Sequence, residues 1–342
     1  MSMWKECEGL QEELVKMRRE LHQIPEFGLD LPETQKYVTD KLDELGIPYK
    51  CSGTDSSIIA EIKGGQPGKT VALRADMDAL KITEANDVDY KSKHEGLMHA
   101  CGHDNHITML LGAAKVLNAH KAEIKGNVRL LFQTAEELSK GAEIMIKDGA
   151  MDGVDAVFGQ HIGSIINKDI PAGKVIITPG CCMASFDRFV IHVKGTGCHG
   201  STPEKGTDPI TMASHIVINL QEIIAREVSA VKAAVVTIGY FHGGVAYNAI
   251  PSEVEIEGTI RALEEPMRQY LAKRIEEIAK STAATFRGTA EVEMDWGAPP
   301  VINNDEMAAL VTEAAKEVVG EEDVFSSCLF QLLQCFGQAF VL

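Results

Sequence analysis

The sequence has no excess of basic residues and no dense set of cysteines, and each absence disfavours a class of protein. Asp and Glu number 50 against 33 Lys and Arg, so the formal net charge is −17. Phosphate backbones and anionic membrane surfaces repel such a chain, which disfavours nucleic-acid binding as a main function. Eight cysteines in 342 residues are too few for a disulfide scaffold. We therefore expect a protein of the reducing cytoplasm.

The sequence also lacks the apolar core of a signal peptide. Residues 1–19 have the pattern of a charged amphipathic helix instead. Residues 325–342 carry no charge, but this run barely reaches the length of a membrane span and contains three glutamines, two serines and a glycine. We therefore predict that the protein does not associate with membranes.

Strand-like and helix-like segments alternate through the first half of the chain. Short apolar runs rich in β-branched residues occupy 58–62, 70–75, 128–132 and 154–158, and helical patterns occupy 34–45, 107–117 and 139–147. Strands that alternate with helices predict an α/β structure with a mostly parallel sheet. We expect the strands of such a sheet to be buried on both faces.

A different pattern begins near residue 184. The segments between 186 and 296 follow the order strand, helix, strand, strand, helix, strand, which is that of a ferredoxin-like unit. Helical sequence then resumes at 304–319. A chain of this length is expected to hold about two domains. We predict a larger α/β domain in two segments, 1–183 and 299–342, interrupted by a smaller domain at 184–298.

The densest chemical cluster lies at 99–106, where Cys101 and His103 stand just before a predicted helix. A thiolate and an imidazole are good ligands for zinc and similar metals. The helix dipole would favour the thiolate form of the cysteine. Two other interpretations fit this cluster taken alone: a His-rich loop without metal, or a Cys101 nucleophile with a histidine base.

Four polar residues that follow predicted strands favour the metal site. These residues are Asp76, Glu136, Glu137 and His161. In an open parallel sheet, ligands bind outside the carboxyl ends of the strands. We therefore expect these side chains to gather near Cys101 and His103.

The paired glutamates indicate hydrolysis. Adjacent side chains on extended backbone diverge, so one carboxylate can bind a metal while the other faces a water molecule. The proximity of two like charges raises the pKa of one carboxylate, which suits a general base. A metal also polarises a carbonyl group, so the combination predicts hydrolysis of an amide or an ester.

The smaller predicted domain has polar groups of its own. Glycine-rich turns present His199 and Asn248, and Arg261 ends a predicted strand. Turn chemistry alone explains these residues equally well.

Several stretches, taken together and in order, resemble a known family. They are 18–22, 73–80, 98–106 (which contains HACGHD), 132–137, 158–161, the glycine-rich turn around His199, 248–251 and 258–261. The chain resembles the amidohydrolase branch of the aminoacylase and carboxypeptidase metallopeptidase superfamily, which includes hippurate hydrolases and indole-acetyl-amino-acid hydrolases. The resemblance implies a site for two divalent metals, with zinc, manganese, nickel or cobalt as candidates. Cys101 would bridge the metals, His103 and His161 would complete one site, and Glu137 would serve the other.

The same resemblance implies roles for the remaining residues. Glu136 would be the general base, and Asp76 would orient the metal ligands. The inserted domain would act as a lid and would join two copies into a homodimer. His199 would polarise the scissile carbonyl, and Asn248 and Arg261 would hold the carboxylate of the substrate. A guanidinium group matches both oxygens of a carboxylate.

The chain departs from this family at its C-terminal end. The family continues further and has a last metal-binding histidine, whereas no histidine follows His242 here. We therefore expect a truncated C-terminus and a weakened second metal site. The leading hypothesis is a metal-dependent amidohydrolase that cleaves N-acyl amino acids to a carboxylic acid and an amino acid. The alternatives are a catalytically impaired relative that retains metal binding or dimerisation only, and a cysteine hydrolase that uses Cys101.

Overall fold

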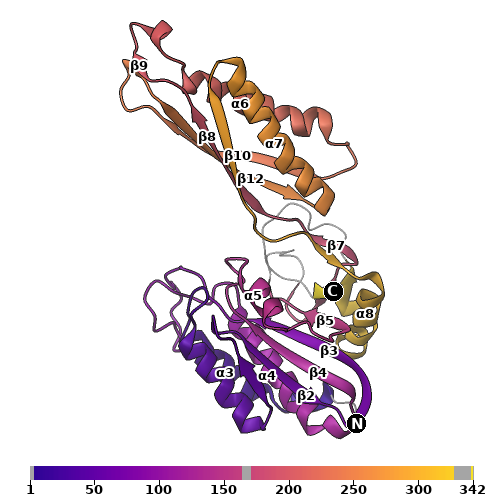
Figure 1. Ribbon diagram of the computed structural model, residues 1–342. Helices are drawn as coiled ribbons and strands as arrows, with labels where there is room; N and C mark the ends of the chain where they lie inside the picture. The colour runs from indigo at the N-terminus through magenta and orange to yellow at the C-terminus, as the bar shows by residue number, and fades with distance from the viewer. Residues whose placement is uncertain (1–3, 164–170, 327–339, 342) are drawn as a thin grey trace. The chain divides into compact units, whose positions relative to one another are not determined.

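The structure is a computed structural model that describes residues 4–163, 171–326 and 340–341. Its internal contacts divide the chain into two units (Figure 1). The first unit comprises Met1–Gly180 together with described residues from Ile302 onward, and the second unit comprises Cys181–Val301. Most of the uncharged run at 325–342 lies outside the described residues. Among the residues that are described, no helix is long and apolar enough to cross a membrane.

The first unit is built around a six-stranded sheet in the order β1-β2-β4-β3-β5-β16. The strands are β1 (Tyr49–Cys51), β2 (Ile58–Lys63), β3 (Gln66–Asp76), β4 (Lys125–Gln133), β5 (Ala156–Gly159) and β16 (Phe340–Val341). The helices are α1 (Trp4–Glu8), α2 (Gln11–His22), α3 (Pro32–Leu45), α4 (His103–Ala119), α5 (Gly141–Lys147) and α8 (Asp305–Val319). Two short strands, β6 (Val175–Ile177) and β15 (Val324–Ser326), form a separate parallel pair.

The sheet of the first unit is mixed, which corrects the expectation of a mostly parallel sheet. β3 runs parallel to β4 and β5, whereas the pairs β1–β2, β2–β4 and β5–β16 are antiparallel. Only Gly64 and Gly65 separate β2 from β3. A parallel connection needs about a dozen residues or more, so the chain has to reverse its direction at these glycines.

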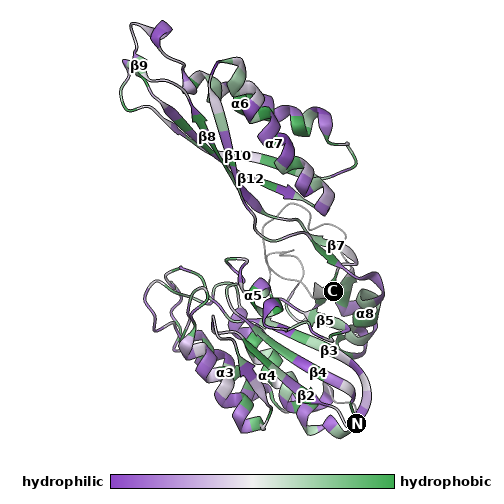
Figure 2. Ribbon diagram, viewed as in Figure 1, coloured by the Kyte–Doolittle hydropathy of each residue, from purple (hydrophilic) through white to green (hydrophobic). Residues whose placement is uncertain are grey.

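Both faces of this sheet are covered, which explains the continuous apolar run in β4. Leu130 and Phe132 point into a core shared with α2, α3 and α4, whereas Leu131 points to the opposite face and packs with Met145 of α5. Figure 2 shows hydrophobic residues along β3 and β4. Full burial of a side chain such as Leu130 contributes about 1.5–3 kcal/mol. The covered sheet is thus a firm support for the loops that follow its strands.

The second unit has a four-stranded antiparallel sheet in the order β10-β12-β8-β13. Its main elements are β8 (Asp187–Lys194), α6 (Pro209–Glu222), β10 (Ala234–Gly243), β12 (Glu253–Ala262), α7 (Glu265–Thr285) and β13 (Thr289–Asp295). A small pair, β9 (Cys198–His199) and β11 (Ala249–Ile250), extends from it, and β7 (Gly180–Met183) and β14 (Val301–Asn303) stand at the junctions of the two units. Phe189, Ile216 and Leu271 lie in the core between the sheet and the two helices.

Candidate metal centre

The strand ends and the start of α4 bring the expected metal-site residues of the first unit together. Asp76 is the last residue of β3, Glu136 and Glu137 follow β4, and His161 follows β5. These three strands are parallel to one another, so their carboxyl ends meet at one edge of the sheet. His103 is the first residue of α4 and points to the same edge.

His103 stands at the centre of this group. Its Nε2 atom lies 3.7 Å from Asp76 Oδ2, 3.9 Å from Glu136 Oε2 and 3.9 Å from Glu137 Oε1. Three sets of possible ligand atoms have members that all lie within 4.8 Å of one another. They are Cys101 with His103 and His161, His103 with Glu136 and Glu137, and Asp76 with His103 and His106.

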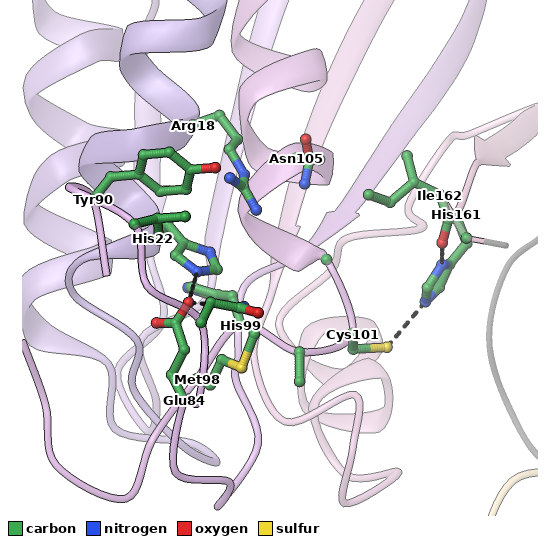
Figure 3. A pocket seen from close by; sticks show the side chains of 15 residues that line it. Arg18, His22, Glu84, Tyr90, Met98, His99, Cys101, Asn105, His161 and Ile162 are labelled. Atoms are coloured by element: carbon green, nitrogen blue, oxygen red, sulfur yellow. Dashed lines mark hydrogen bonds and ion pairs between the residues drawn. The ribbon is translucent and has the colours of Figure 1, made fainter. Parts of the chain in front are cut away.

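His161 is oriented toward Cys101 by its neighbour in the chain. Its Nδ1 donates to the carbonyl oxygen of Ile162, so Nε2 is directed to the Cys101 sulfur at 3.1 Å (Figure 3). Burial, together with the nearby His106, lowers the pKa of His161 to about 4. The imidazole is therefore neutral at physiological pH, which is the form that binds metals.

The buried polar atoms of this group fit a metal ion. Among the described residues, neither ring nitrogen of His103 has a hydrogen-bond partner, and the same holds for Oε1 of Glu137. Buried polar groups are otherwise nearly always hydrogen-bonded in proteins, so such a concentration of unpaired atoms calls for a ligand. Thiolate, imidazole and carboxylate are the donors that zinc and related transition metals accept.

The pKa values of the two carboxyl groups Asp76 and Glu136 are shifted in opposite directions at this site. Burial raises the pKa of Glu136 to about 7, and the charge of Asp76 adds to this shift, although Arg74 and His103 oppose it. Burial also acts to raise the pKa of Asp76, but Arg74 and His103 outweigh it and hold that pKa well below its ordinary value. Asp76 is thus ionised while Glu136 titrates near neutral pH, which is a useful range for a general base.

Cys101 has surroundings that differ from those expected for a thiolate beside a helix N-terminus. Burial raises the pKa of its thiol, and the charges of Glu137 and Glu136 raise it further. Burial and the charges of these carboxylates thus outweigh the partial charge of the helix. A cysteine nucleophile needs a lowered pKa, so the protein side chains alone do not favour a cysteine hydrolase.

The structure identifies Asp78 as a further site residue. Asp78 is fully buried, and its Oδ1 lies 3.5 Å from Nδ1 of His103. The same carboxylate accepts hydrogen bonds from the backbone amides of Glu136, at 3.0 Å, and Glu137, at 3.1 Å. Between the strand and these glutamates, Ala135 has a positive φ of 46°, which is uncommon for a residue with a side chain. Asp78 stands two residues after Asp76, and alternate residues of an extended chain point to the same side. This spacing is the feature of the sequence that could have indicated Asp78.

His106 is a second residue that the sequence did not single out for a role. Its Nδ1 lies 2.5 Å from Asp76 Oδ1, and its Nε2 accepts a hydrogen bond from the backbone amide of Ile162 at 2.9 Å. These contacts link the end of β3 to the segment that holds His161. The orienting role expected for Asp76 stays a prediction, and the geometry adds Asp78 and His106 to the residues around the ligands.

The other three expected site residues belong to the second unit and are described there by themselves. His199 is exposed in β9, and its Nδ1 lies 2.7 Å from the hydroxyl oxygen of Ser201. Asn248 is exposed just before β11. Arg261, near the end of β12, donates to the carbonyl oxygen of Ile260 at 2.9 Å. Their expected roles stay predictions.

Comparison with known proteins connects this geometry with a family of hydrolases. The profile of peptidase family M20/M25/M40 matches residues 72–331. The chain is 41% identical over 307 residues to the N-acetyl-L-cysteine deacetylase of Bacillus subtilis, and the match covers 90% of this chain and 73% of that protein. It is also 41% identical over 295 residues to an N-acyl-L-amino acid amidohydrolase of Geobacillus stearothermophilus, covering 86% of this chain and 79% of that protein.

A solved structure matches most of the chain. It is that of a dinuclear metal-binding peptidase of the M20 family from Bacillus subtilis, with 34% sequence identity and a TM-score of 0.81. The match covers 96% of this chain and 84% of that one.

Proposed function

This chain belongs to peptidase family M20/M25/M40, and on that premise we propose that it is a metal-dependent amidohydrolase. It hydrolyses the amide bond of N-acyl amino acids and releases a carboxylic acid and an amino acid. Its relatives at about 40% identity are named for such reactions. The observation that carries the proposal is the buried group of ligand atoms around His103, in which both ring nitrogens of His103 and Oε1 of Glu137 have no hydrogen-bond partner among the described residues.

The residues of the first unit would hold two divalent metals. Cys101, His103 and His161 form one group of ligand atoms, and Glu137 serves the other site. The chemistry that bound metals supply is an activated water molecule and a polarised amide carbonyl. Zinc, manganese, nickel and cobalt are the candidates. We propose that the second metal is held more weakly, because among the described residues only Glu137 is assigned to it beside the shared Cys101.

Glu136 is the proposed general base. Its side chain is 30% exposed, more than the 9% of the Glu137 side chain, so it can reach a water molecule on the open side of the site. It takes a proton from the attacking water and delivers it to the amide nitrogen as the bond breaks. Asp78 accepts hydrogen bonds from the backbone amides of both glutamates and faces His103. It thereby fixes the position of the base relative to the ligand His103.

We also propose roles for the segment 184–298, which interrupts a catalytic domain formed by 1–183 and 299–342. This segment serves as a lid and as the surface that joins two copies into a homodimer. His199 polarises the scissile carbonyl, and Asn248 and Arg261 bind the substrate carboxylate. The family resemblance supports these assignments, and the location of the enzyme in the cytoplasm is likewise a proposal.

A metal-reconstitution assay tests the proposed function. The purified chain is stripped of metal with a chelator, reloaded separately with zinc, manganese, nickel or cobalt, and incubated with N-acetyl, N-benzoyl and indole-acetyl amino acids. We expect release of the free amino acid that depends on added metal and stops when the chelator returns. Failure to release an amino acid from every substrate with every metal would refute the proposal.

A further inference from the structure

A cavity of about 480 Å³ adjoins the ligand group and lies entirely within the first unit. Its walls come from α2, from the segment 84–90, from the loop before α4 and from residues 161–163. Figure 3 shows Cys101 and His161 on one side of this cavity and Arg18, His22 and Tyr90 on the other. Ligand pockets commonly have volumes of about 300–1,000 Å³, so this space exceeds the needs of a bound water molecule.

One wall of the cavity contains charges that offset each other. Arg18 Nε lies 2.9 Å from Asp104 Oδ2, and His22 lies between Asp104 Oδ2 at 2.7 Å and Glu84 Oε1 at 3.2 Å. Burial lowers the pKa of His22, but its contacts with Asp104 and Glu84 outweigh burial and raise that pKa above its ordinary value. The basic groups of this wall, Arg18 and His22, are therefore already in contact with carboxylates.

The cavity also contains a buried polar side chain without a partner. His99 is only 3% exposed, and neither of its ring nitrogens has a hydrogen-bond partner among the described residues. Its ring centroid lies 6.4 Å from that of His22, whose own nitrogens are both engaged. A buried imidazole offers hydrogen-bonding capacity, so a ligand that brings a polar atom to it would be favoured.

The remaining walls combine apolar side chains with two amides, Asn86 and Asn105, which donate hydrogen bonds to Glu84 and Asp104. Val88, Met98 and Ile162 line the cavity, and the Arg18 guanidinium lies 5.3 Å from the centre of the Tyr90 ring. A hydrocarbon or aromatic group can therefore contact these walls while a polar atom at its rim reaches His99. Small-molecule sites likewise combine apolar walls with placed polar groups that fix the orientation of a ligand.

We propose that this cavity is the subsite for the acyl group of the substrate, and that it selects uncharged acyl groups that carry a hydrogen-bonding atom within reach of His99. The inference rests on the proposed function and specifies its substrate class. The cavity adjoins Cys101 and His161, where the scissile carbonyl would bind. The amino-acid half carries a carboxylate, which this cavity does not favour because Arg18 and His22 already contact carboxylates.

Matched substrates test the hydrogen bond separately from size. The enzyme, reconstituted with the metal that gives the highest rate, is assayed with the 4-hydroxyphenylacetyl and 4-methylphenylacetyl conjugates of one amino acid, which have nearly the same shape. We expect kcat/KM to favour the hydroxyl compound by about tenfold, the scale of one hydrogen bond. A 4-carboxyphenylacetyl conjugate should be a poorer substrate than the hydroxyl compound, because the basic groups of the cavity, Arg18 and His22, already contact carboxylates.

Two variants assign the preference to the cavity. His99→Leu should bring the ratio of kcat/KM for the hydroxyl and methyl substrates to about one, whereas His99→Gln should retain part of the preference. The matched control is His120→Leu, at the opposite end of α4, which should leave the ratio as in the wild type. If the variants of His99 do not fold, Val88→Phe provides an independent test, because filling the cavity should lower kcat/KM for both aryl substrates relative to an N-acetyl amino acid by about tenfold or more.

The outcomes distinguish this inference from the proposed function. A wild-type enzyme that cleaves no N-acyl amino acid overturns both. An enzyme that cleaves N-acetyl amino acids but shows a ratio near one for the matched pair, or a ratio unchanged by His99→Leu, overturns the subsite alone. If His99 variants are unfolded, the subsite is overturned by equal effects of Val88→Phe on the aryl and acetyl substrates.

Discussion

The Asp78 carboxylate lies 3.5 Å from Nδ1 of His103, so the other ring nitrogen of His103 is directed to Asp76, Glu136 and Glu137. A carboxylate behind a histidine fixes the ring orientation and raises its basicity as a metal ligand. Asp78 also binds the backbone amides of both glutamates. One buried side chain thus positions groups from α4 and from the loop after β4.

Replacement of Asp78 by Asn should weaken metal binding by about 10–100-fold, the range found for partners of metal-binding histidines. The amide keeps the size of the side chain but loses the charge that faces His103. Competition with a chromogenic chelator measures the affinity. Asp87→Asn, an exposed change in the loop before α4, is the matched control and should bind metal like the wild type. An unchanged affinity of Asp78→Asn would remove this role.

Substitutions of the two adjacent glutamates should affect different properties, turnover in one case and metal binding in the other. Glu136→Gln should retain metal but lose about 10²–10⁴-fold in kcat, because the base is removed while the shape remains. Glu137→Gln should instead lower metal occupancy, because a carboxylate ligand is replaced by a neutral amide. Elemental analysis and steady-state kinetics on the same preparations check both statements. A Glu136→Gln variant with near wild-type turnover would show that the assignment of the base is wrong.

Glu136 should also make the metal-free protein less stable as the pH rises. Its pKa is about 7 in the folded chain against an ordinary value of 4.5. The folded state therefore holds this proton more tightly than the unfolded state, and the resulting stability is present below pH 4.5 and is lost as the pH rises through 7. In the presence of a chelator, the melting temperature of the wild type should fall more between pH 5 and pH 8 than that of Glu136→Gln. Parallel pH profiles of the two proteins would contradict this linkage.

Arg261→Ala should weaken binding of substrates that have a free α-carboxylate and should spare the corresponding amides. The reason is that a guanidinium group forms paired hydrogen bonds with a carboxylate and gains little from a neutral amide. KM values for an N-acetyl amino acid and its carboxamide, measured side by side, provide the test. Equal losses for both substrates would argue against recognition of the carboxylate.

Metal binding should occur in two steps of unequal affinity. In the proposed site, the group of Cys101, His103 and His161 would supply the tighter position, and Glu137 would be the main terminal ligand of the second metal. Mass spectrometry of metal content after desalting should find about one tightly bound metal per chain, and added metal should restore the second. Two metals that both survive desalting would contradict the weakened second site.

Local sequence patterns determined a large part of the candidate metal centre. Asp76, Glu136, Glu137 and His161 each follow an apolar run that forms a strand, and Cys101 and His103 precede a helical pattern. β3, β4 and β5 are parallel, so residues that follow them must share one edge of the sheet. The convergence of these side chains could therefore be predicted without a tertiary structure.

The tertiary structure decided what depends on pairing and packing between distant segments. The short connection at Gly64 and Gly65 reverses the chain, so β2 runs antiparallel to β4. That β2 pairs with β4 at all is decided by contacts between segments that are distant in the sequence. Asp78 became a site residue only because the loop after β4 turns its amides onto that carboxylate. Sequence alone did not predict the raised pKa of the Cys101 thiol, because burial and carboxylates from another loop outweigh the local helix dipole. A local pattern specifies which groups are present, whereas their charges and partners depend on neighbours that only the folded chain brings within a few ångströms.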